Sequence, residues 1–254
     1  MKLEMMYEIL INLGTAIGIA VYVFLAYRYF KNWRIVLGST LIILVLFIVS
    51  NPFGQFVKRL TYWDWSNFNE FIAELKEYGG NHFLGRVLFV SVTAPVCLKL
   101  LKKQDAKTDK VVISQCLDIL SFVIVIQHFF NRAACYTAGC CYGKPYHGFG
   151  AVKFTWGTAF NLGVTYPVYP TQLFEMFGMV LLLGIIIVGF IKKKHIFNLT
   201  IIGFGVIIFI SEFFMNQTGM IQILGFTWIQ IFAAILFLLG IIRYSIHKRM
   251  INHK

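Results

Sequence analysis

The sequence predicts an all-α polytopic membrane protein, with seven transmembrane helices, an external N-terminus and a cytoplasmic C-terminus. The first observation is composition: 58% of the 254 residues are hydrophobic and only 13% are charged. Soluble domains carry about 25% charged residues, so this chain lacks the polar surface of one. The net charge of +12 does not indicate a nucleic-acid partner, because the basic residues cluster between apolar runs, where they meet anionic lipid.

The second observation is a series of apolar runs of roughly 20 residues, the length that crosses a bilayer as a helix. Seven such runs can be placed, near 7–29, 34–51, 82–101, 111–130, 170–191, 196–214 and 223–246. The first run lacks the basic start and small-residue cleavage site of a signal peptide, so we expect it to remain as the first helix. Residues 1–254 are therefore expected to form a single integral membrane domain.

The third observation is the uneven distribution of basic residues between the connections. Alternate connections hold 15 of the 23 Lys and Arg residues, in groups within 28–34, 99–110, 192–194 and 243–254. The other connections hold the rest over much longer loops. Because basic loops stay in the cytoplasm, this asymmetry predicts an N-out, C-in orientation.

Two outer connections are long enough to form structure of their own. Within the loop 52–81, the segment SNFNEFIAELKEY (66–78) has an apolar and a polar face, which predicts a helix lying on the outer membrane interface. The loop 131–169 is rich in Cys, Gly and aromatic residues, and its AVKFTW (151–156) alternates as a short strand would. We expect this small outer region to cover the mouth of the bundle without a core of its own.

Polar and ionisable residues near the outer helix ends converge on one level of the predicted bundle. They are His82, Arg86, Arg132, Gln172, Glu175 and Glu212. Any one of them could snorkel to the interface, but charges inside a bilayer are costly, so their convergence predicts a polar cavity that opens to the outer leaflet. Arginines suit a phosphate and a histidine can remove a proton near neutral pH.

Four segments match motifs of a known family: GGNHFLGRV (79–87), NRAACYTAGCCYG (131–143), YPTQLFE (169–175) and ISEFFMNQ (210–217). All four resemble segments of the bacterial prolipoprotein diacylglyceryl transferases. YPTQLFE (169–175) resembles the family's His-Pro-Ser-Gln-Leu-Tyr-Glu segment. NRAACYTAGCCYG (131–143) resembles its Gly-Arg-x-Gly-Asn-Phe-x-Asn-x-Glu-x-x-Gly motif, and is closer to a divergent branch with Cys-Cys-Tyr-Gly-Lys-Pro. GGNHFLGRV (79–87) is similar to the segment with the family's essential histidine, and ISEFFMNQ (210–217) is similar to its Glu-Phe-Phe-Arg-Gln run.

The resemblance implies transfer of a diacylglyceryl group from phosphatidylglycerol to the lipobox cysteine thiol of a prolipoprotein. The reaction would take place at the outer leaflet of a bacterial plasma membrane and require no cofactor and no metal. His82 would take the thiol proton and Arg132 would hold the phosphate, with Glu212 completing the catalytic set. The substrates would be bound by Arg86, Gln172, Glu175, Tyr142 and Gly143. The implied partners are phosphatidylglycerol, the lipobox peptide and membrane lipid.

The chain departs from the family pattern at four positions. Cys135 and Cys140 stand where the motif has asparagine and glutamate, and Ile208 and Met215 stand where the family has arginines near the glutamate that matches Glu212. Three alternatives therefore remain open: a related lipid-modifying transferase with another acceptor, a non-catalytic lipid-binding relative, and a membrane metal or redox protein that uses the cysteine loop.

The cysteines of the outer loop also leave alternatives open. Cys135, Cys140 and Cys141 are predicted to lie outside, where a Cys135–Cys140 disulfide can form. Free thiols that pack the loop, a metal site with His147 or His128, and a redox thiol are the other possibilities, although the C-x4-C-C-x5-H spacing is not a common zinc pattern. The two other cysteines, at 97 and 116, are expected in the helical core.

Overall fold

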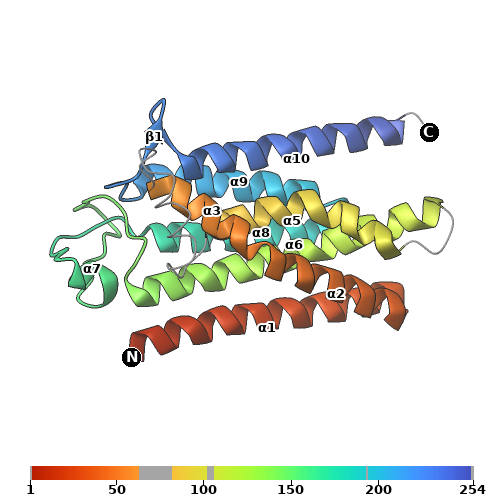
Figure 1. Ribbon diagram of the computed structural model, residues 1–254, viewed down its shortest axis with the longest axis horizontal. Coiled ribbons are helices and arrows are strands. Elements are labelled where there is room, and N and C mark those ends of the chain that lie inside the picture. Colours follow the sequence, from red (N-terminus) through yellow and green to blue (C-terminus); the bar gives the residue numbers. More distant parts are fainter. Residues whose placement is uncertain (1, 63–81, 102–105, 193, 253–254) are drawn as a thin grey trace.

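The computed structural model describes residues 2–62, 82–101, 106–192 and 194–252, which form a bundle of long helices (Figure 1). The helices are α1 (Lys2–Phe30), α2 (Trp33–Val49), α3 (Asn51–Tyr62), α5 (Phe83–Cys97), η1 (Leu98–Leu101), α6 (Ala106–Ala138), α7 (Gly157–Asn161), α8 (Thr171–Ile191), α9 (Phe197–Phe214) and α10 (Trp228–Asn252). Strands β1 (Gln222–Ile223) and β2 (Phe226–Thr227) pair antiparallel. We call the end with α7 and β1 the hairpin end, and the other the C-terminal end.

Seven helical spans of the described part are long and apolar enough to cross a membrane, which confirms the predicted fold class. They are Leu3–Phe30, Trp33–Thr61, Phe83–Leu100, Lys110–Ala138, Thr171–Ile191, Phe197–Phe214 and Trp228–Ile246. The N-terminal residues lie at the hairpin end and the chain finishes at the opposite end, as an odd number of crossings requires (Figure 1). Which end faces outward stays a prediction from the basic residues.

The second span is longer than the sequence predicted, because α3 follows α2 almost without interruption. We expected the helix to end at 51, before Pro52. Instead, Pro52 lies in the first turn of α3, where a helix has no use for the missing N–H. The loop expected over 52–81 therefore begins as helix, and the interfacial helix expected over 66–78 lies outside the described residues.

The fourth span is also longer than predicted, since α6 continues to Ala138 rather than ending near 130. Polar Asn131 and Arg132 suggested a loop, but Arg132 is buried in an ion pair that lets the helix continue. The helix ends at Gly139, whose φ of 63° is the left-handed conformation that glycine adopts without strain. The outer loop therefore starts eight residues later than expected.

The part of the outer loop after α6 has a small core, contrary to our expectation. Phe154, Ala159, Val164 and Val168 are buried together, apart from the main core of the bundle. The expected strand over 151–156 is reduced to a single bridge between Val152 and Val168. Burial of these apolar side chains holds the loop in one conformation over the hairpin end.

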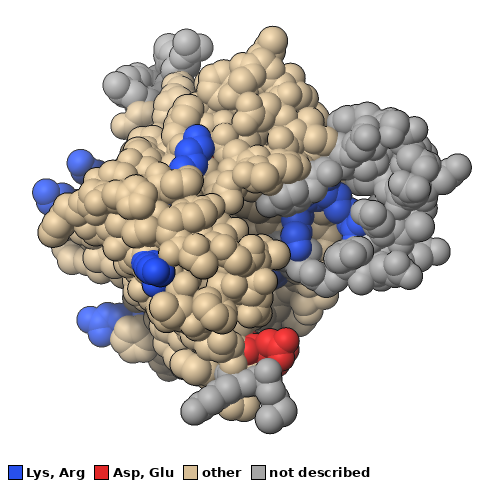
Figure 2. All heavy atoms as spheres, turned by 90° about the vertical axis from the view of Figure 1, so that its left-hand side faces the viewer, with Lys and Arg blue, Asp and Glu red and all other residues tan. Residues whose placement is uncertain are grey.

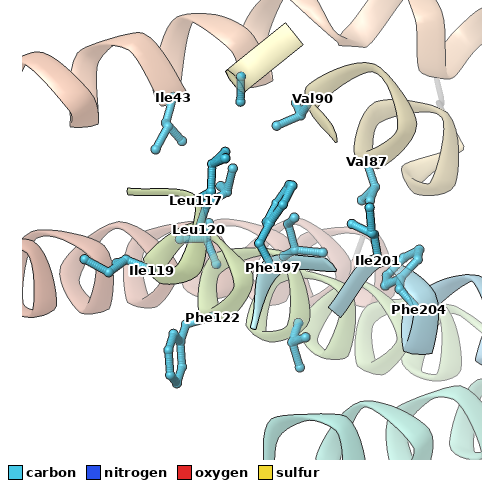
Figure 3. Packing of buried hydrophobic residues seen from close by; sticks show 14 of the residues in the cluster. Ile43, Val87, Val90, Leu117, Ile119, Leu120, Phe122, Phe197, Ile201 and Phe204 are labelled. Atoms are coloured by element: carbon cyan, nitrogen blue, oxygen red, sulfur yellow. The ribbon is translucent and has the colours of Figure 1, made fainter. Parts of the chain in front are cut away.

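The main core fills the space between α2, α5, α6 and α9. Figure 3 shows Leu117 and Leu120 of α6 in the same part of the core as Phe197 of α9. Inside a bilayer there is no water for apolar side chains to leave, so the hydrophobic effect does not hold the helices together. Close packing, which small residues allow, contributes more here. At Gly205, for example, an added Cβ would lie 2.8 Å from a carbonyl oxygen of α10. This packing fixes the relative positions of the helices that carry the polar residues.

Candidate active site

A cavity of about 660 Å³ opens at the hairpin end, lined by α1, α3, α5, α6 and the segments that follow α6 and α9. His82, Arg86, Arg132 and Tyr142, which the sequence singled out, contribute to its wall. Lys58 of α3, which we had not singled out, adds a third Lys or Arg side chain. Figure 2 shows this end, with basic side chains visible in a hollow. A concave surface with several cations attracts an anionic ligand.

Glu175 is the centre of a polar cluster next to this cavity. Its Oε2 accepts a hydrogen bond from Nε of Arg132 at 2.6 Å, and lies 2.8 Å from Nε2 of His128. Its Oε1 accepts a hydrogen bond from the hydroxyl of Ser211 at 3.1 Å. The carboxylate is buried, and its partners come from α6 and α9 while it belongs to α8. Because a buried charge-assisted pair resists displacement, Glu175 fixes the position of Arg132.

Arg132 retains hydrogen-bonding capacity beyond this pair. Its Nε donates to Glu175, whereas its two terminal nitrogens make no hydrogen bond to any residue that the structure describes. The side chain is 7% exposed and lines the cavity. A guanidinium held through Nε can still bind two oxygens of one phosphate through its terminal nitrogens.

His82 immediately precedes α5, and the backbone sets its position. Its N–H donates to the carbonyl of Gly54 in α3 at 2.9 Å. Gly85 allows this close approach, because an added Cβ there would lie 2.8 Å from Val57. The Nδ1 of His82 is buried and has no partner among the described residues. Burial and then the charge of Arg132 lower the pKa of His82 to about 4, so the imidazole is neutral at pH 7.

Arg86 lies one helical turn after His82, as predicted, but most of its donors bind the protein. Its Nη2 donates to the carbonyl of Phe47 at 2.9 Å and its Nε donates to the hydroxyl of Ser50 at 3.3 Å. The guanidinium also lies over the Phe47 ring, 5.6 Å from its centroid. Arg86 therefore joins α5 to the end of α2, where helix carbonyls need donors, and adds positive charge to the cavity wall.

Gln172 and Glu212 are buried near the cavity but do not line it. The side-chain amide of Gln172 donates to the carbonyl of Cys140, which fixes the loop after α6 against the start of α8. Glu212 accepts a hydrogen bond from the hydroxyl of Thr227 at 3.2 Å. Both residues therefore lie behind the cavity wall, and the substrate contact expected of Gln172 stays a prediction.

Gly143 is needed for a close approach of two backbone segments. Its N–H donates to the carbonyl of Tyr169 at 2.9 Å, and it bridges to Met215 beyond α9. An added Cβ would lie 2.6 Å from the carbonyl oxygens of both Tyr169 and Phe214. No larger residue fits here without moving backbone, and the substrate binding expected at Gly143 stays a prediction.

The three cysteines of the outer loop converge, a grouping that the sequence had left open. Cys135 is buried in the last turn of α6, Cys140 is half-buried and Cys141 is exposed. Their sulfur atoms lie within 4.8 Å of one another, and all three residues line the cavity. All three are free thiols, so the Cys135–Cys140 disulfide is not formed. Within the described part, neither His128 nor His147 joins the cluster.

Asp118 belongs to a different site, towards the C-terminal end of the bundle. Its Oδ1 accepts hydrogen bonds from the backbone N–H groups of Ile196 and Phe197, each at 2.9 Å. Its Oδ2 lies 3.6 Å from Nδ1 of His195. Asp118, His195 and Phe197 line a second cavity of about 340 Å³. Asp118 therefore caps the start of α9, since the first N–H groups of a helix need acceptors.

Comparison with known protein families shows which family the chain belongs to. A family model of prolipoprotein diacylglyceryl transferases matches residues 5–246, nearly the whole sequence. The chain belongs to this family. A search of curated proteins finds no match. The family consists of transferases that act on a lipid donor and a prolipoprotein in the membrane. The match also includes the first two helices, which the resemblance of short segments did not cover.

The two positions near Glu212 of α9 where the resemblance implies arginines hold buried apolar residues. Ile208 is 1% exposed and Met215 is 5% exposed, so neither position carries charge into the cavity. Lys58 and Ser211 are the contributors that sequence reasoning missed. Ser211 directly precedes Glu212, and Lys58 lies in a basic pair on what was expected to be loop, so position alone gave little signal.

Proposed function

We propose that this protein transfers a diacylglyceryl group from phosphatidylglycerol to the lipobox cysteine thiol of a prolipoprotein, at the outer leaflet of a bacterial plasma membrane. The observation that carries the proposal is the state of Arg132. A buried carboxylate holds it through Nε, and its terminal nitrogens are available at a cavity of about 660 Å³. A phosphodiester head group supplies the paired oxygens that this arrangement binds.

The reaction forms a bond between the thiol sulfur and the glyceryl carbon, and breaks the bond between that carbon and a phosphate oxygen. The electron pair of the broken bond stays on the phosphate, which leaves as glycerol phosphate, and the thiol proton passes to His82. Negative charge grows on the phosphate as the carbon–oxygen bond breaks, so Arg132 stabilises the transition state more than the bound lipid. His82 is neutral before the reaction, and a bound phosphate would raise its pKa by offsetting the charge of Arg132, towards the range that a general base needs.

Lys58 and Arg86 support the proposal through charge. Both line the cavity, in a protein where Ile208 and Met215 replace two family arginines. Arg86 already donates to α2, so it contributes a positive potential rather than paired hydrogen bonds to the phosphate. Electrostatic attraction of an anionic head group therefore does not depend on the two lost arginines.

The test is a transfer assay with purified protein, phosphatidylglycerol and a synthetic lipobox peptide. Mass spectrometry should find the diacylglyceryl thioether on the peptide, together with released glycerol phosphate. A peptide with serine in place of the acceptor cysteine should remain unmodified, and phosphatidylethanolamine should be a poor donor. If folded, monodisperse protein forms no thioether with any phospholipid, the result contradicts the proposal.

The outward orientation has its own test in intact cells. A cysteine introduced at Lys2 should react with a membrane-impermeant thiol reagent, and one introduced at Lys254 should not, because the basic connections are predicted to face the cytoplasm. The parent protein provides the background from its own cysteines. The reverse labelling pattern would place the cavity on the cytoplasmic side and contradict the proposed location.

A further inference from the structure

Three free thiols lie in the cavity wall, and none of them takes part in the proposed transfer reaction. Cys135 lies in the last turn of α6, and Cys140 and Cys141 follow just after the end of that helix. Their sulfur atoms lie within 4.8 Å of one another. The thiols belong to the same cavity as His82 and Arg132, so any ligand they share would meet both substrates there.

The backbone of this turn is held in place from two sides. The N–H of Cys140 donates to the carbonyl of Cys135 at 3.1 Å. The carbonyl of Cys140 accepts a hydrogen bond from the side chain of Gln172, and that of Cys141 accepts one from the hydroxyl of Thr171 at 2.6 Å. The first turn of α8 therefore fixes the two adjacent cysteines independently of their side chains.

Cys141 adopts a backbone conformation that L-residues rarely adopt. Its φ is 57°, in the left-handed region that glycine normally occupies. Adjacent residues of an extended chain point to opposite sides, whereas this conformation brings the side chain of Cys141 to the same side as that of Cys140. A strained non-glycine residue that gathers three thiols indicates a constraint from function.

The spacing of the sulfur atoms fits a metal ion of the zinc class. Tetrahedral zinc with bonds of about 2.3 Å requires sulfurs about 3.8 Å apart, so the cluster needs to contract by at most about 1 Å. Thiolates are the ligands that zinc and other soft cations select. Three protein ligands leave a fourth position, which is the arrangement of catalytic rather than structural zinc.

The surroundings suit a thiolate cluster. Three thiolates and one zinc ion carry a net charge of −1, and the buried guanidinium of Arg132 lines the same cavity. The thiol of Cys135 lies 3.8 Å from Oδ1 of Asn131, one turn earlier in α6. With the amide turned round, Asn131 can donate to a bound sulfur, as outer-shell partners of zinc commonly do.

We propose that Cys135, Cys140 and Cys141 bind one zinc ion as thiolates, and that the fourth position of this ion takes the acceptor thiol of the lipobox. This inference rests on the proposed function for its second part. Zinc releases the three protein thiol protons to solvent, and the acceptor loses its proton to His82 as it binds. The bound sulfur then attacks the glyceryl carbon, and the electron pair of the carbon–oxygen bond leaves with the phosphate. The ion itself is neither oxidised nor reduced.

Binding of the acceptor thiol to zinc would supply the thiolate that the reaction needs. The thiolate is the nucleophile, yet a free cysteine with a pKa of about 8.5 is mostly protonated at neutral pH. A metal ion deprotonates a thiol that it binds. Alkylation of the acceptor then weakens its bond to the ion, because a thioether is a poorer ligand than a thiolate, which allows the product to leave.

The first experiment measures zinc in purified full-length protein, kept reduced and equilibrated with zinc. Elemental analysis should find about one zinc per chain in the parent and in Cys97→Ser, the matched control from α5. Zinc should fall to background in Cys135→Ser and Cys140→Ser, and also in Cys141→Ser, where the exposed position removes concern about folding. Background zinc in the parent, or equal zinc in all four variants, overturns the inference.

The second experiment follows the fourth position in protein loaded with cobalt(II), whose sulfur-to-metal charge-transfer absorption reports thiolate ligands. The cysteine lipobox peptide should strengthen this absorption, whereas the serine peptide should not. No response to the cysteine peptide overturns the acceptor role. Full transfer activity in metal-free protein overturns the inference but leaves the proposed function standing. A cobalt response without any transfer product supports the inference while the proposed function fails.

Discussion

Glu175 and Asp118 are both buried carboxylates in helices of the bundle, but they bind different kinds of partner. Glu175, towards the hairpin end, contacts the side chains of Arg132, His128 and Ser211. Asp118, towards the C-terminal end, accepts hydrogen bonds from two backbone N–H groups at the start of α9. Backbone partners have fixed positions in any folded helix, so Asp118 serves the fold. Side-chain partners beside a large cavity can also serve a ligand.

The arginines near these carboxylates differ in the same way. Arg243, in the wall of the smaller cavity, donates to Asn198 and to the carbonyl of Ser91, and lies over the ring of Phe197. Its donors thus connect helices. Arg132 has one donor fixed and two terminal nitrogens that bind no described residue. A basic cavity alone therefore does not identify a site; hydrogen-bonding capacity that the fold leaves unused does.

The largest expected effect is that of His82→Asn. Asparagine keeps size and polarity but cannot accept the proton, so turnover should fall by about 10²–10⁴-fold. His147→Asn, at an exposed position of the outer loop, is the matched control and should keep parental turnover. The comparison uses the initial rate of thioether formation at equal amounts of folded protein. Turnover of His82→Asn within a few-fold of the parent removes this residue from the mechanism.

The next largest effect is expected at Arg132. Removing its charge in Arg132→Gln should lower turnover by about 10²–10³-fold, the usual loss for one donor to a transition-state oxyanion. Arg132→Lys keeps the charge but loses the paired geometry, so it should also lose most activity. Arg28→Gln, at an exposed position in the last turn of α1, controls for general loss of charge. A fully active lysine variant would contradict paired phosphate binding by Arg132.

A smaller effect, on stability rather than turnover, is expected at the C-terminal end. Asp118→Ala leaves two buried N–H groups of α9 without an acceptor, so the free energy of unfolding should fall by about 2–4 kcal/mol. Lys110→Ala, at an exposed position of the same helix, should change it little. Denaturant unfolding in detergent measures both. Equal stability of the two variants would mean that α9 starts without help from Asp118.

Several features of the fold were predictable from the sequence because they depend on local composition. The seven spans follow from apolar length, and the grouping of His82, Arg86 and Arg132 at one cavity follows from their shared depth. The predicted end of α6 was wrong because the ion pair that buries Arg132 involves Glu175, which is 43 residues away in the sequence. The sequence gives no direct sign of such distant contacts.

The arrangement of the three cysteines also could not be predicted from the sequence. Their spacing left a disulfide, free thiols and, with a less usual pattern, a metal site open, because the outcome depends on the backbone of one turn. The positive φ of Cys141 and the hydrogen bonds from Thr171 and Gln172 bring the thiols together. Neither a glycine nor a proline marks this turn at Cys141, so its conformation could not be predicted.

The central claim is that Glu175 positions a phosphate-binding arginine, whereas Asp118 only holds the fold. The most direct test measures turnover per folded molecule for Glu175→Gln and Asp118→Asn, two substitutions that remove one charge and keep the shape of a buried carboxylate. Glu175→Gln should lose about 10²-fold or more, because Arg132 is no longer held by an anion. Asp118→Asn should stay within two- to three-fold of the parent, since an amide oxygen can accept the same backbone hydrogen bonds. Equal losses in the two variants, or a greater loss in Asp118→Asn, would contradict this division of roles.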